Sequence, residues 1–559
     1  MEKQWWKKVV AYQVYPRSFM DSNGDGIGDL RGVMSKLDYL KDLGIDVIWL
    51  SPVYASPNED NGYDISDYHA IMEEFGTMAD FDALLKEVHQ RGMKLIMDLV
   101  INHTSDEHPW FIESRSSKLS PKREWYIWRK PVGGKEPNNW ASIFGGSAWK
   151  YDEGTGEYYL HLFGSKQPDL NWENQEVREA LYEMVNKWLD KGIDGFRIDA
   201  ISHIKKAEGL PNLPNPHNLP YVPSFSQHMN QPGILTFLNE LTERTFRNYD
   251  IMTVGEANGV VAQEGEDWAG DQGPFNMIFQ FEHLDLWVQE GSEEVETPYR
   301  VNALHLKKTL SKWQEALYNK GWNALFIENH DLPRVVSRLG DEDTYWAESC
   351  KALAMMYFLM QGTPFIYQGQ EIGMTNIHLP SIEAYKDIQT INTYKKALQQ
   401  GKTIQEALEI VWNDTRDNSR TPMQWNDGPS AGFTTGTPWF NVNPNYKKIN
   451  VEAQQKDPNS ILNFYKALIK IKKRDPVFEE GYYKLLLEED EDLFVYTRTT
   501  SEEKMLIMCN LCAEERSFQV EESLVQSDQL LLSNYEVEPH GPSHKIKLRA
   551  YEARLYKLI

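Results

Sequence analysis

Three carboxylates in this sequence each stand at or just beyond the end of a short apolar run that is typical of a buried strand: Asp199, Glu256 and Asp331. Burying a carboxylate is costly unless the group is paired. When two carboxylates lie close together, repulsion raises one pKa, which leaves one group ionised and the other protonated. Such a pair can supply a nucleophile and a general acid, the division of labour that cleavage of a glycosidic bond requires.

Arg197 lies two residues before Asp199, so on a strand the two side chains point to the same face and can pair. We therefore predict that Arg197 orients Asp199 and holds it ionised. For the stretch 195–200 alone, a purely structural ion pair is the alternative. No phosphate-binding glycine loop, Ser–His–Asp order or zinc ligand cluster in the sequence offers a competing chemistry.

The three carboxylates can meet only if the fold brings the ends of distant strands together, and the apolar runs predict such a fold. Strands are expected at 9–15, 45–50, 94–103, 195–199, 250–255, 277–281, 323–327 and 363–367, with helices between them that include 30–43, 79–91 and 174–191. Eight strands alternating with helices predict an α/β fold, the (β/α)8 TIM barrel. In that barrel the C-terminal strand ends meet at one face, where active sites are built.

Two segments interrupt or follow this alternation. Residues 104–172 are rich in Trp, Tyr, Gly and Pro and predict an inserted subdomain after the third strand. The barrel itself is expected at 1–103 and 173–479. Residues 480–559 carry short alternating strands and predict a separate C-terminal antiparallel β domain, a β-sandwich.

The composition restricts the partners and the compartment. A net charge of −25 argues against nucleic acid and anionic membranes and suits a soluble protein with a neutral small substrate. Only three cysteines occur, and no apolar run resembles a signal peptide or a membrane span. We expect a cytoplasmic monomer or homodimer without an organic cofactor.

One loop after the first strand has the spacing of a calcium-binding loop. Oxygen ligands alternate along it, with a glycine at the sharp turn and a backbone carbonyl at the next position. The predicted ligands of a structural Ca²⁺ or Mg²⁺ are Asp21, Asn23, Asp25, the carbonyl of Ile27, and Asp29. The loop lacks the distal Glu of an EF-hand, because Gly32 stands there. A solvated acidic turn is the alternative.

The chain resembles the α-amylase superfamily of retaining α-glycosidases from end to end. Four short stretches carry the resemblance, at 98–103, 195–200, 254–257 and 328–331. Two more, at 167–171 and 416–425, resemble the oligo-1,6-glucosidase and α-glucosidase branch, most closely its bacterial exo-α-1,4-glucosidases.

The resemblance implies a role for each carboxylate. Asp199 would form the covalent glucosyl intermediate, Glu256 would act as acid and then base, and Asp331 would bind the sugar 2- and 3-hydroxyls as the transition state develops. It also implies a pocket for the non-reducing glucose, for which a plain loop contact is the alternative at each position. That pocket would be formed by Asp60, Tyr63, His103, Phe163, Arg197, His330 and Arg416.

The residue after the nucleophile bears on the linkage. Relatives that favour isomaltose usually have Val there, whereas this chain has Ala200, which leaves room beside the leaving sugar. One or two methyl groups are worth about 1–3 kcal/mol of discrimination. We therefore predict an exo-acting α-1,4-glucosidase that acts on maltose and short malto-oligosaccharides and retains some α-1,6 activity. Oligo-1,6-glucosidase is the alternative.

Two further alternatives for the function remain. A trehalose-6-phosphate hydrolase would need a cationic cradle, for which Lys205 and Lys206 are faint candidates. Some relatives of this superfamily are catalytically dead ectodomains that chaperone membrane transporters; they carry a membrane helix and often lose part of the carboxylate triad. This sequence has no such apolar run and keeps all three carboxylates.

Overall fold

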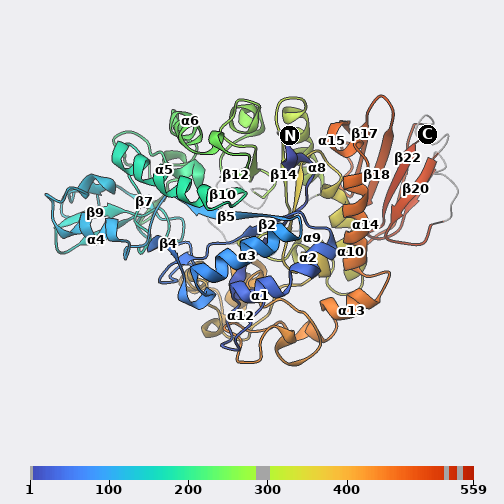
Figure 1. The fold of residues 1–559 in the computed structure, drawn as a ribbon, viewed down its shortest axis with the longest axis horizontal. Coiled ribbons are helices and arrows are strands. Elements are labelled where there is room, and N and C mark those ends of the chain that lie inside the picture. Colours follow the sequence, from blue (N-terminus) through green and yellow to red (C-terminus); the bar gives the residue numbers. More distant parts are fainter. Residues whose placement is uncertain (1–3, 285–302, 522–527, 538–544, 559) are drawn as a thin grey trace.

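Eight parallel strands form the centre of the protein in the computed structural model, which describes residues 4–284, 303–521, 528–537 and 545–558 (Figure 1). Their hydrogen-bonded order is β13-β12-β10-β5-β2-β1-β15-β14, and a parallel bridge between Ile278 and Asn323 brings the two edges together. The strands are β1 Ala11–Val14, β2 Val47–Leu50, β5 Lys94–Val100, β10 Gly195–Asp199, β12 Met252–Ala257, β13 Met277–Gln280, β14 Ala324–Leu325 and β15 Thr363–Tyr367. The predicted (β/α)8 barrel is confirmed.

Two strands differ from their predicted extents in ways that affect the site. The seventh strand is only two residues long, so His330 and Asp331 lie on a loop well beyond its end. Strand β12 continues through Glu256, which the sequence had placed just after the strand. The strand therefore fixes the direction of the Glu256 side chain.

Large rings fill the barrel beneath the strand ends. Trp49 and Phe279 lie 5.5 Å apart between ring centroids, and Phe279 and Phe365 lie 4.7 Å apart. These residues belong to one buried cluster drawn from most of the barrel strands. Such close packing is expensive to disturb, so the strand ends above it are held in fixed positions.

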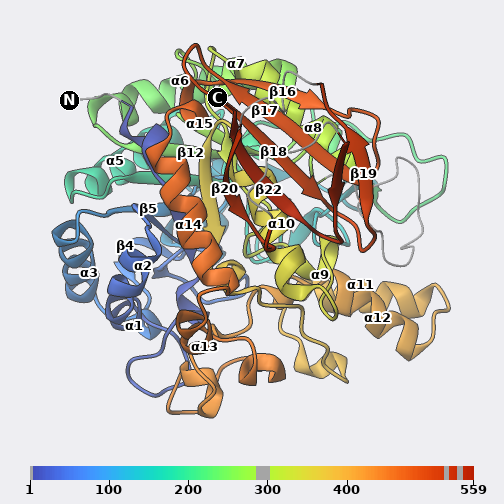
Figure 2. The ribbon, with the colours of Figure 1, turned by 90° about the vertical axis from the view of Figure 1, so that its right-hand side faces the viewer.

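Helices cover the outside of the barrel (Figures 1 and 2). They are α1 Leu30–Ser35, α2 Leu37–Leu43, α3 Met78–Gln90, α5 Gln175–Asp190, α6 Ile234–Arg244, α7 Gly265–Ala269, α8 Ala303–Leu317, α9 Val335–Leu339, α10 Trp346–Phe358, α13 Val451–Lys456, α14 Ile461–Arg474 and α15 Val477–Glu480. The single helix predicted over 30–43 was wrong, because the chain breaks at Lys36. The two halves have different partners: α1 packs on α3, and α2 packs on α14.

The segment predicted as an insertion projects to one side of the barrel. It contains α4 Pro109–Ser116 and a three-stranded sheet of β6 Trp128–Arg129, β9 Glu157–Leu160 and β8 Trp149–Asp152. Strand β7, Trp140–Ala141, pairs with β11, Val222–Pro223, from the loop after β10. The loop after β10 is thus attached to this subdomain.

Three smaller features complete the fold. A hairpin of β3 Tyr54–Ala55 and β4 Asp67–Ile71 follows β2. A helical hairpin, α11 Ile388–Gln399 and α12 Ile404–Asp414, follows β15. None of the described helices is long and apolar enough to cross a bilayer.

Antiparallel strands form the C-terminal region (Figure 2). A five-stranded sheet has the order β16-β17-β18-β22-β20, and a two-stranded sheet pairs β19 with β21. Their bounds are β16 Tyr482–Leu486, β17 Leu493–Thr499, β18 Lys504–Asn510, β19 Arg516–Gln519, β20 Asp528–Ser533, β21 Lys545–Leu548 and β22 Ala553–Leu558. Apolar side chains of both sheets share one cluster, as in a sandwich. Residues 522–527, 538–544 and 559 of the predicted domain lie outside the described residues.

Candidate active site

A single guanidinium connects three carboxylates at the C-terminal ends of neighbouring strands. Arg197 Nη1 donates to Asp199 Oδ1 at 2.6 Å and to Asp98 Oδ1 at 2.8 Å, while its Nη2 donates to Glu256 Oε1 at 2.5 Å. The register explains the arrangement, because Arg197 on β10 is aligned with Asp98 on β5 and with Val254 on β12. The predicted pairing of Arg197 with Asp199 is present, and Asp98 and Glu256 share it.

Burial changes the ionisation that we expected. It raises the pKa of Asp199 to about 7 and that of Glu256 to about 7, although Arg197 lowers both. It also raises the pKa of Asp98 to about 6. Arg197 thus lowers the pKa of Asp199, as predicted, but does not hold Asp199 fully ionised at neutral pH, because one cation cannot offset the burial of three carboxylates. The cluster holds a proton near neutral pH, as a nucleophile paired with a general acid requires.

Ala200 turns the backbone directly after Asp199. Its φ of 44° and ψ of 31° lie in the left-handed region, which is uncommon for a residue with a Cβ. The turn directs the Ala200 N–H at Glu256 Oε2, 2.7 Å away. This hydrogen bond favours the ionised form of Glu256 and fixes the carboxyl group beside Asp199.

Asp331 has a different environment. Arg420 Nη2 donates to Asp331 Oδ1 at 2.8 Å, Arg416 Nη1 donates to the same oxygen at 3.2 Å, and His330 Nε2 lies 3.0 Å from Oδ2. Burial alone would raise the pKa of Asp331, but these neighbours lower it well below its usual range. Asp331 therefore stays ionised while the pair beside Arg197 holds a proton.

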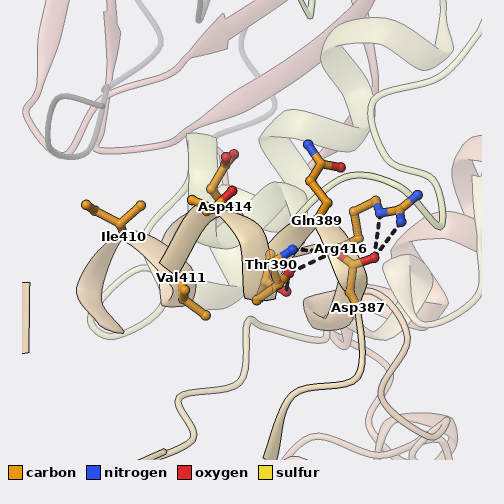
Figure 3. A pocket seen from close by; sticks show the side chains of 9 residues that line it. Asp387, Gln389, Thr390, Ile410, Val411, Asp414 and Arg416 are labelled. Atoms are coloured by element: carbon orange, nitrogen blue, oxygen red, sulfur yellow. Dashed lines mark hydrogen bonds and ion pairs between the residues drawn. The ribbon is translucent and has the colours of Figure 1, made fainter. Parts of the chain in front are cut away.

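Asp387 supports this cluster from the start of α11. Its Oδ1 accepts from Arg416 Nε and Nη2 at 3.0 and 2.5 Å, and its Oδ2 accepts from the Thr390 backbone N–H and hydroxyl, both at 2.9 Å (Figure 3). Asp387 thus both caps the N-terminus of α11 and binds Arg416. Since Arg416 Nη2 also lies 3.3 Å from Asp60 Oδ1, this arginine joins three acidic residues.

A cavity of about 190 Å³ opens above these groups. The three catalytic candidates line it, as do most of the predicted binding residues: Asp60, Tyr63, His103, Phe163, Ala200 and Arg416. The structure places Arg197 and His330 behind the wall, where each is at most 1% exposed. Those two residues orient others in the free protein. Arg197 holds carboxylates, and the ring of His330 stacks on Tyr63 at 5.1 Å.

On the side of the inserted subdomain, two neutral polar side chains, His103 and Gln167, form or support the cavity wall. Burial lowers the pKa of His103, so its ring is uncharged at neutral pH. Gln167 Nε2 lies 3.0 Å from Asp60 Oδ2 and 3.2 Å from His103 Nε2, and the ring of Phe163 lies 5.1 Å from that of His103. Neutral donors and acceptors beside an aromatic ring suit an uncharged sugar.

Several residues of the site were missed in the sequence. Asp98 offered a signal, because a carboxylate inside an apolar strand requires a partner. Arg420 lies within the stretch 416–425, which resembles the glucosidase branch, but the sequence predicted no role for it. The others lie in loops, in short 3₁₀ helices or at the start of α11 and offered no comparable signal: Ile143, Phe144, His203, Phe225, Asn258, Phe281, Asp387 and Gln389.

The predicted metal loop is ordered by its own side chains. The carboxylate or amide oxygens of Asp21, Asn23 and Asp25 each accept the backbone N–H two residues on, at 2.8–2.9 Å. This repeat suits a hard cation bound by alternate oxygens. Asp29 fits less well, because its carboxylate caps α1 and binds Ser22. Among the described residues no group of three or more acidic, His or Cys side chains is arranged for a metal, so Ca²⁺ or Mg²⁺ here stays a prediction.

Gly26 in this loop has a steric role besides its turn. A Cβ on Gly26 would lie 1.8 Å from the carbonyl oxygen of Thr437. Trp439 N–H donates to the Gly26 carbonyl at 2.9 Å, and Thr434 Oγ1 donates to Asp21 at 2.5 Å. The loop is therefore fastened to the segment 433–439, and this contact requires glycine whether or not a cation binds.

A cation in the loop should stabilise the folded protein. Adding Ca²⁺ to chelator-treated protein should raise Tm, since a ligand at 100 times its Kd contributes about 2.7 kcal/mol. Asp25→Asn should weaken the shift, because it removes a charge from an exposed predicted ligand, while the Asn oxygen can still accept from the Ile27 N–H. Thermal melts with Ca²⁺, Mg²⁺ and chelator check this; identical melting in all three would contradict the metal site.

The raised pKa of Asp199 also predicts a pH-dependent stability. Its folded value of about 7 exceeds the unfolded value of about 3.9, so the contribution is fully present below pH 3.9 and is lost as the pH rises through 7. Asp199→Asn should therefore raise Tm more at pH 8 than at pH 5, by the equivalent of about 1–3 kcal/mol. Glu183→Gln, at an exposed site on α5, is the control. An equal shift at both pH values would contradict the prediction.

Comparisons with known proteins identify the family of the chain. Residues 13–481 match the family described as "Alpha amylase, catalytic domain". The chain is 57% identical over 557 residues to the "Probable oligo-1,6-glucosidase 3" of Bacillus subtilis (strain 168), with 100% of both chains covered. It is 54% identical to the "Oligo-1,6-glucosidase" of Parageobacillus thermoglucosidasius, again with 100% of both covered.

A solved structure extends the likeness to three dimensions. The crystal structure of trehalose-6-phosphate hydrolase from Bacillus licheniformis matches with a TM-score of 0.92 at 44% identity and covers 99% of each chain. The match includes the barrel and both of the appended regions. This chain belongs to the alpha-amylase family of glycoside hydrolases, in the branch of the oligo-1,6-glucosidases and α-glucosidases.

Proposed function

We propose that this protein is a retaining, exo-acting α-glucosidase that removes the terminal non-reducing glucose from short oligosaccharides, with α-1,6-linked substrates such as isomaltose preferred. The observation that carries the proposal is the Arg197 guanidinium, which binds Asp199 and Glu256 together at the floor of a small pocket. The α-1,6 preference rests on the names of the relatives that are 54–57% identical over the whole chain.

The shared guanidinium supports retention of configuration. Two carboxyl groups bound to one fork are held close together, which favours the separation of about 5–5.5 Å of retaining enzymes over the roughly 6.5–9.5 Å of inverting ones. In the first step Asp199 attacks the anomeric carbon while Glu256 gives its proton to the leaving oxygen. In the second step Glu256 takes a proton from water, which displaces Asp199 and releases α-glucose.

The end of the pocket around Arg416 supports exo action. Arg416 is held by Asp387, Asp60 and Asp331, and its guanidinium lies 4.8 Å from the centroid of the Phe144 ring. The inserted subdomain and α11 also meet here, since Asn392 Nδ2 donates to the Phe144 carbonyl at 2.8 Å. A chain longer than one sugar on this side would have to break these contacts.

The α-1,4 linkage predicted from the sequence is the second candidate. Ala200 lines the pocket beside Asp199, and its small side chain supports room for a maltose-type leaving sugar. The comparisons support the α-1,6 alternative better, because the relatives at 54–57% identity carry that name. The left-handed backbone of Ala200 adds a reason for a small residue, since a β-branched side chain is strained there.

The other two alternatives have less support. Lys205 Nζ pairs with Glu173 and Lys206 Nζ pairs with Asp169, both at 2.7 Å, so neither is free to hold a phosphate. Arg416, the cationic residue among those that line the cavity, is occupied by three carboxylates. A catalytically dead protein would not need to keep a costly cluster of buried carboxylates in an open pocket.

The linkage proposal is tested by comparing kcat/KM for isomaltose and maltose, with starch as a third substrate. We expect isomaltose to be preferred and starch to be poor. Ala200→Val should raise the isomaltose-to-maltose ratio by about 10–100-fold, because added methyl groups restrict the leaving-group side. Ala200→Gly, which is compatible with the left-handed turn, is the control.

Each outcome has a distinct meaning. A preference for maltose would favour the second candidate and leave the α-glucosidase proposal intact. Rapid loss of starch viscosity would contradict exo action. A stable enzyme inert on all three substrates would contradict the proposed function itself. Because valine at position 200 also costs about 1–3 kcal/mol through backbone strain, Tm is measured alongside.

A further inference from the structure

Two histidine rings meet at the wall of the cavity. His203 Nδ1 lies 2.9 Å from His228 Nδ1, and both residues are almost completely buried. Two ring nitrogens at this distance require one donor and one acceptor when both rings are neutral. Burial lowers the pKa of His203 to about 3 and that of His228 well below its usual value, so both rings are neutral at neutral pH.

The direction of the His203–His228 hydrogen bond is determined by the contacts that His228 makes through Ser224. The Ala141 carbonyl can only accept, so Ser224 Oγ donates to it, at 3.0 Å. Ser224 Oγ must then accept from His228 Nε2, 3.2 Å away. The His228 proton is therefore on Nε2, and its Nδ1 carries a lone pair. His203 must donate from Nδ1, which leaves its Nε2 as an acceptor.

His203 Nε2 has no hydrogen-bond partner within the described chain, and His203 lines the cavity. The residue ends a short 3₁₀ helix, Ile201–His203, that begins immediately after Ala200. Since Glu256 must face the glycosidic oxygen and accepts a hydrogen bond from Ala200, this part of the wall lies on the leaving-group side.

We propose that His203 Nε2 accepts a hydrogen bond from a hydroxyl group of the leaving sugar, and that His228 and Ser224 are positioning residues that fix this acceptor by holding the His203 proton on Nδ1. The inference rests on the proposed α-glucosidase function and deepens it. The site recognises a sugar leaving group with a hydroxyl donor, and it discriminates against leaving groups that lack one.

The hydrogen-bonded series His203–His228–Ser224–Ala141, here called the relay, also joins three parts of the chain. His203 follows β10, Ser224 and His228 follow β11, and Ala141 ends β7 in the inserted subdomain. The docking of the subdomain on the β10 loop, through the β7–β11 pairing, therefore sets the hydrogen-bonding character of the leaving-group site. A rearrangement of that junction would change substrate choice without touching Asp199 or Glu256.

The test compares a disaccharide with 4-nitrophenyl α-glucoside, whose leaving group has no sugar hydroxyl. Ser224→Ala and His228→Leu should each lower kcat/KM for the disaccharide about fivefold more than for the aryl glucoside, mainly through a higher KM, since one hydrogen bond is worth about 1 kcal/mol. Ser224→Thr keeps the hydroxyl and should restore the ratio. Thermal melts show whether each variant is folded.

A double-mutant cycle separates the relay from general packing. In a His203→Phe background, Ser224→Ala should cause no further change in the disaccharide-to-aryl ratio, because the acceptor that it positions is gone. An additive effect of the two substitutions, or an unchanged ratio in Ser224→Ala alone, would overturn the inference. Failure of the wild type to cleave either substrate would instead contradict the proposed function.

Discussion

Replacing Glu256 by Gln should lower kcat for isomaltose by about 10³–10⁴-fold, the larger part of the range for a general acid. The amide keeps the size of the side chain, and its one oxygen can accept from either Arg197 or Ala200, but its NH2 group cannot accept from the other and has no acidic proton to give to the leaving oxygen. 4-Nitrophenyl α-glucoside should lose much less in its first step, because nitrophenolate leaves without being protonated. The difference is measured as kcat/KM on both substrates, which reports the first step and excludes the later release of glucose from Asp199.

The control for this substitution is Glu282→Gln. The Glu282 carboxylate binds Lys312 and the Trp313 ring N–H and does not line the cavity, so its loss should leave the ratio between the two substrates unchanged. An equal loss of kcat/KM on the disaccharide and on the aryl glucoside in Glu256→Gln would contradict the role of proton donor and would indicate a general disturbance of the site.

Arg197→Met should have an effect of similar size by a different route. It leaves Asp98, Asp199 and Glu256 without their shared cation, and an uncompensated buried charge costs about 3–5 kcal/mol. Because Arg197 lowers the pKa of each carboxyl group, its removal raises all three. Asp199 then ionises only at higher pH, so the acid limb of the kcat/KM profile should move to higher pH while activity falls at least about 10³-fold.

Arg123→Met is the matched control for stability. Arg123 is also a buried arginine paired with a glutamate, Glu157, but it lies in the inserted subdomain away from the cavity. Its loss should lower Tm without moving the pH profile. Arg197→Lys keeps the charge but lacks the planar fork that binds Asp199 and Glu256 through separate nitrogens, so an intermediate shift is expected. An acid limb that stays in place in Arg197→Met would show that Arg197 does not tune Asp199.

Positions in the site were predicted most reliably for residues that lie on the same strand. Arg197 and Asp199 share one face of β10 because strand residues two apart always do, and the apolar runs around them predicted the barrel. Asp98 was within reach of the same reasoning, since parallel strand order and register place it opposite Arg197.

Contacts made by distant loops could not be predicted in this way. Asp387 and Arg416 meet because α11 and the segment after α12 fold back over the pocket, and nothing in either stretch encodes that meeting. The same holds for His203 and His228, which meet through the β7–β11 pairing. The pKa of Asp199 depends on the depth of burial, which residue types alone do not give.

The stereochemistry of the first turnovers tests the central claim most directly. ¹H NMR of isomaltose hydrolysis, recorded before the released sugar can mutarotate, distinguishes α-glucose from β-glucose at the new reducing end. Attack by Asp199 followed by water on the same face predicts α-glucose as the first product. β-Glucose as the first product would contradict a retaining mechanism, and with it the assignment of Asp199 as nucleophile and Glu256 as acid and base.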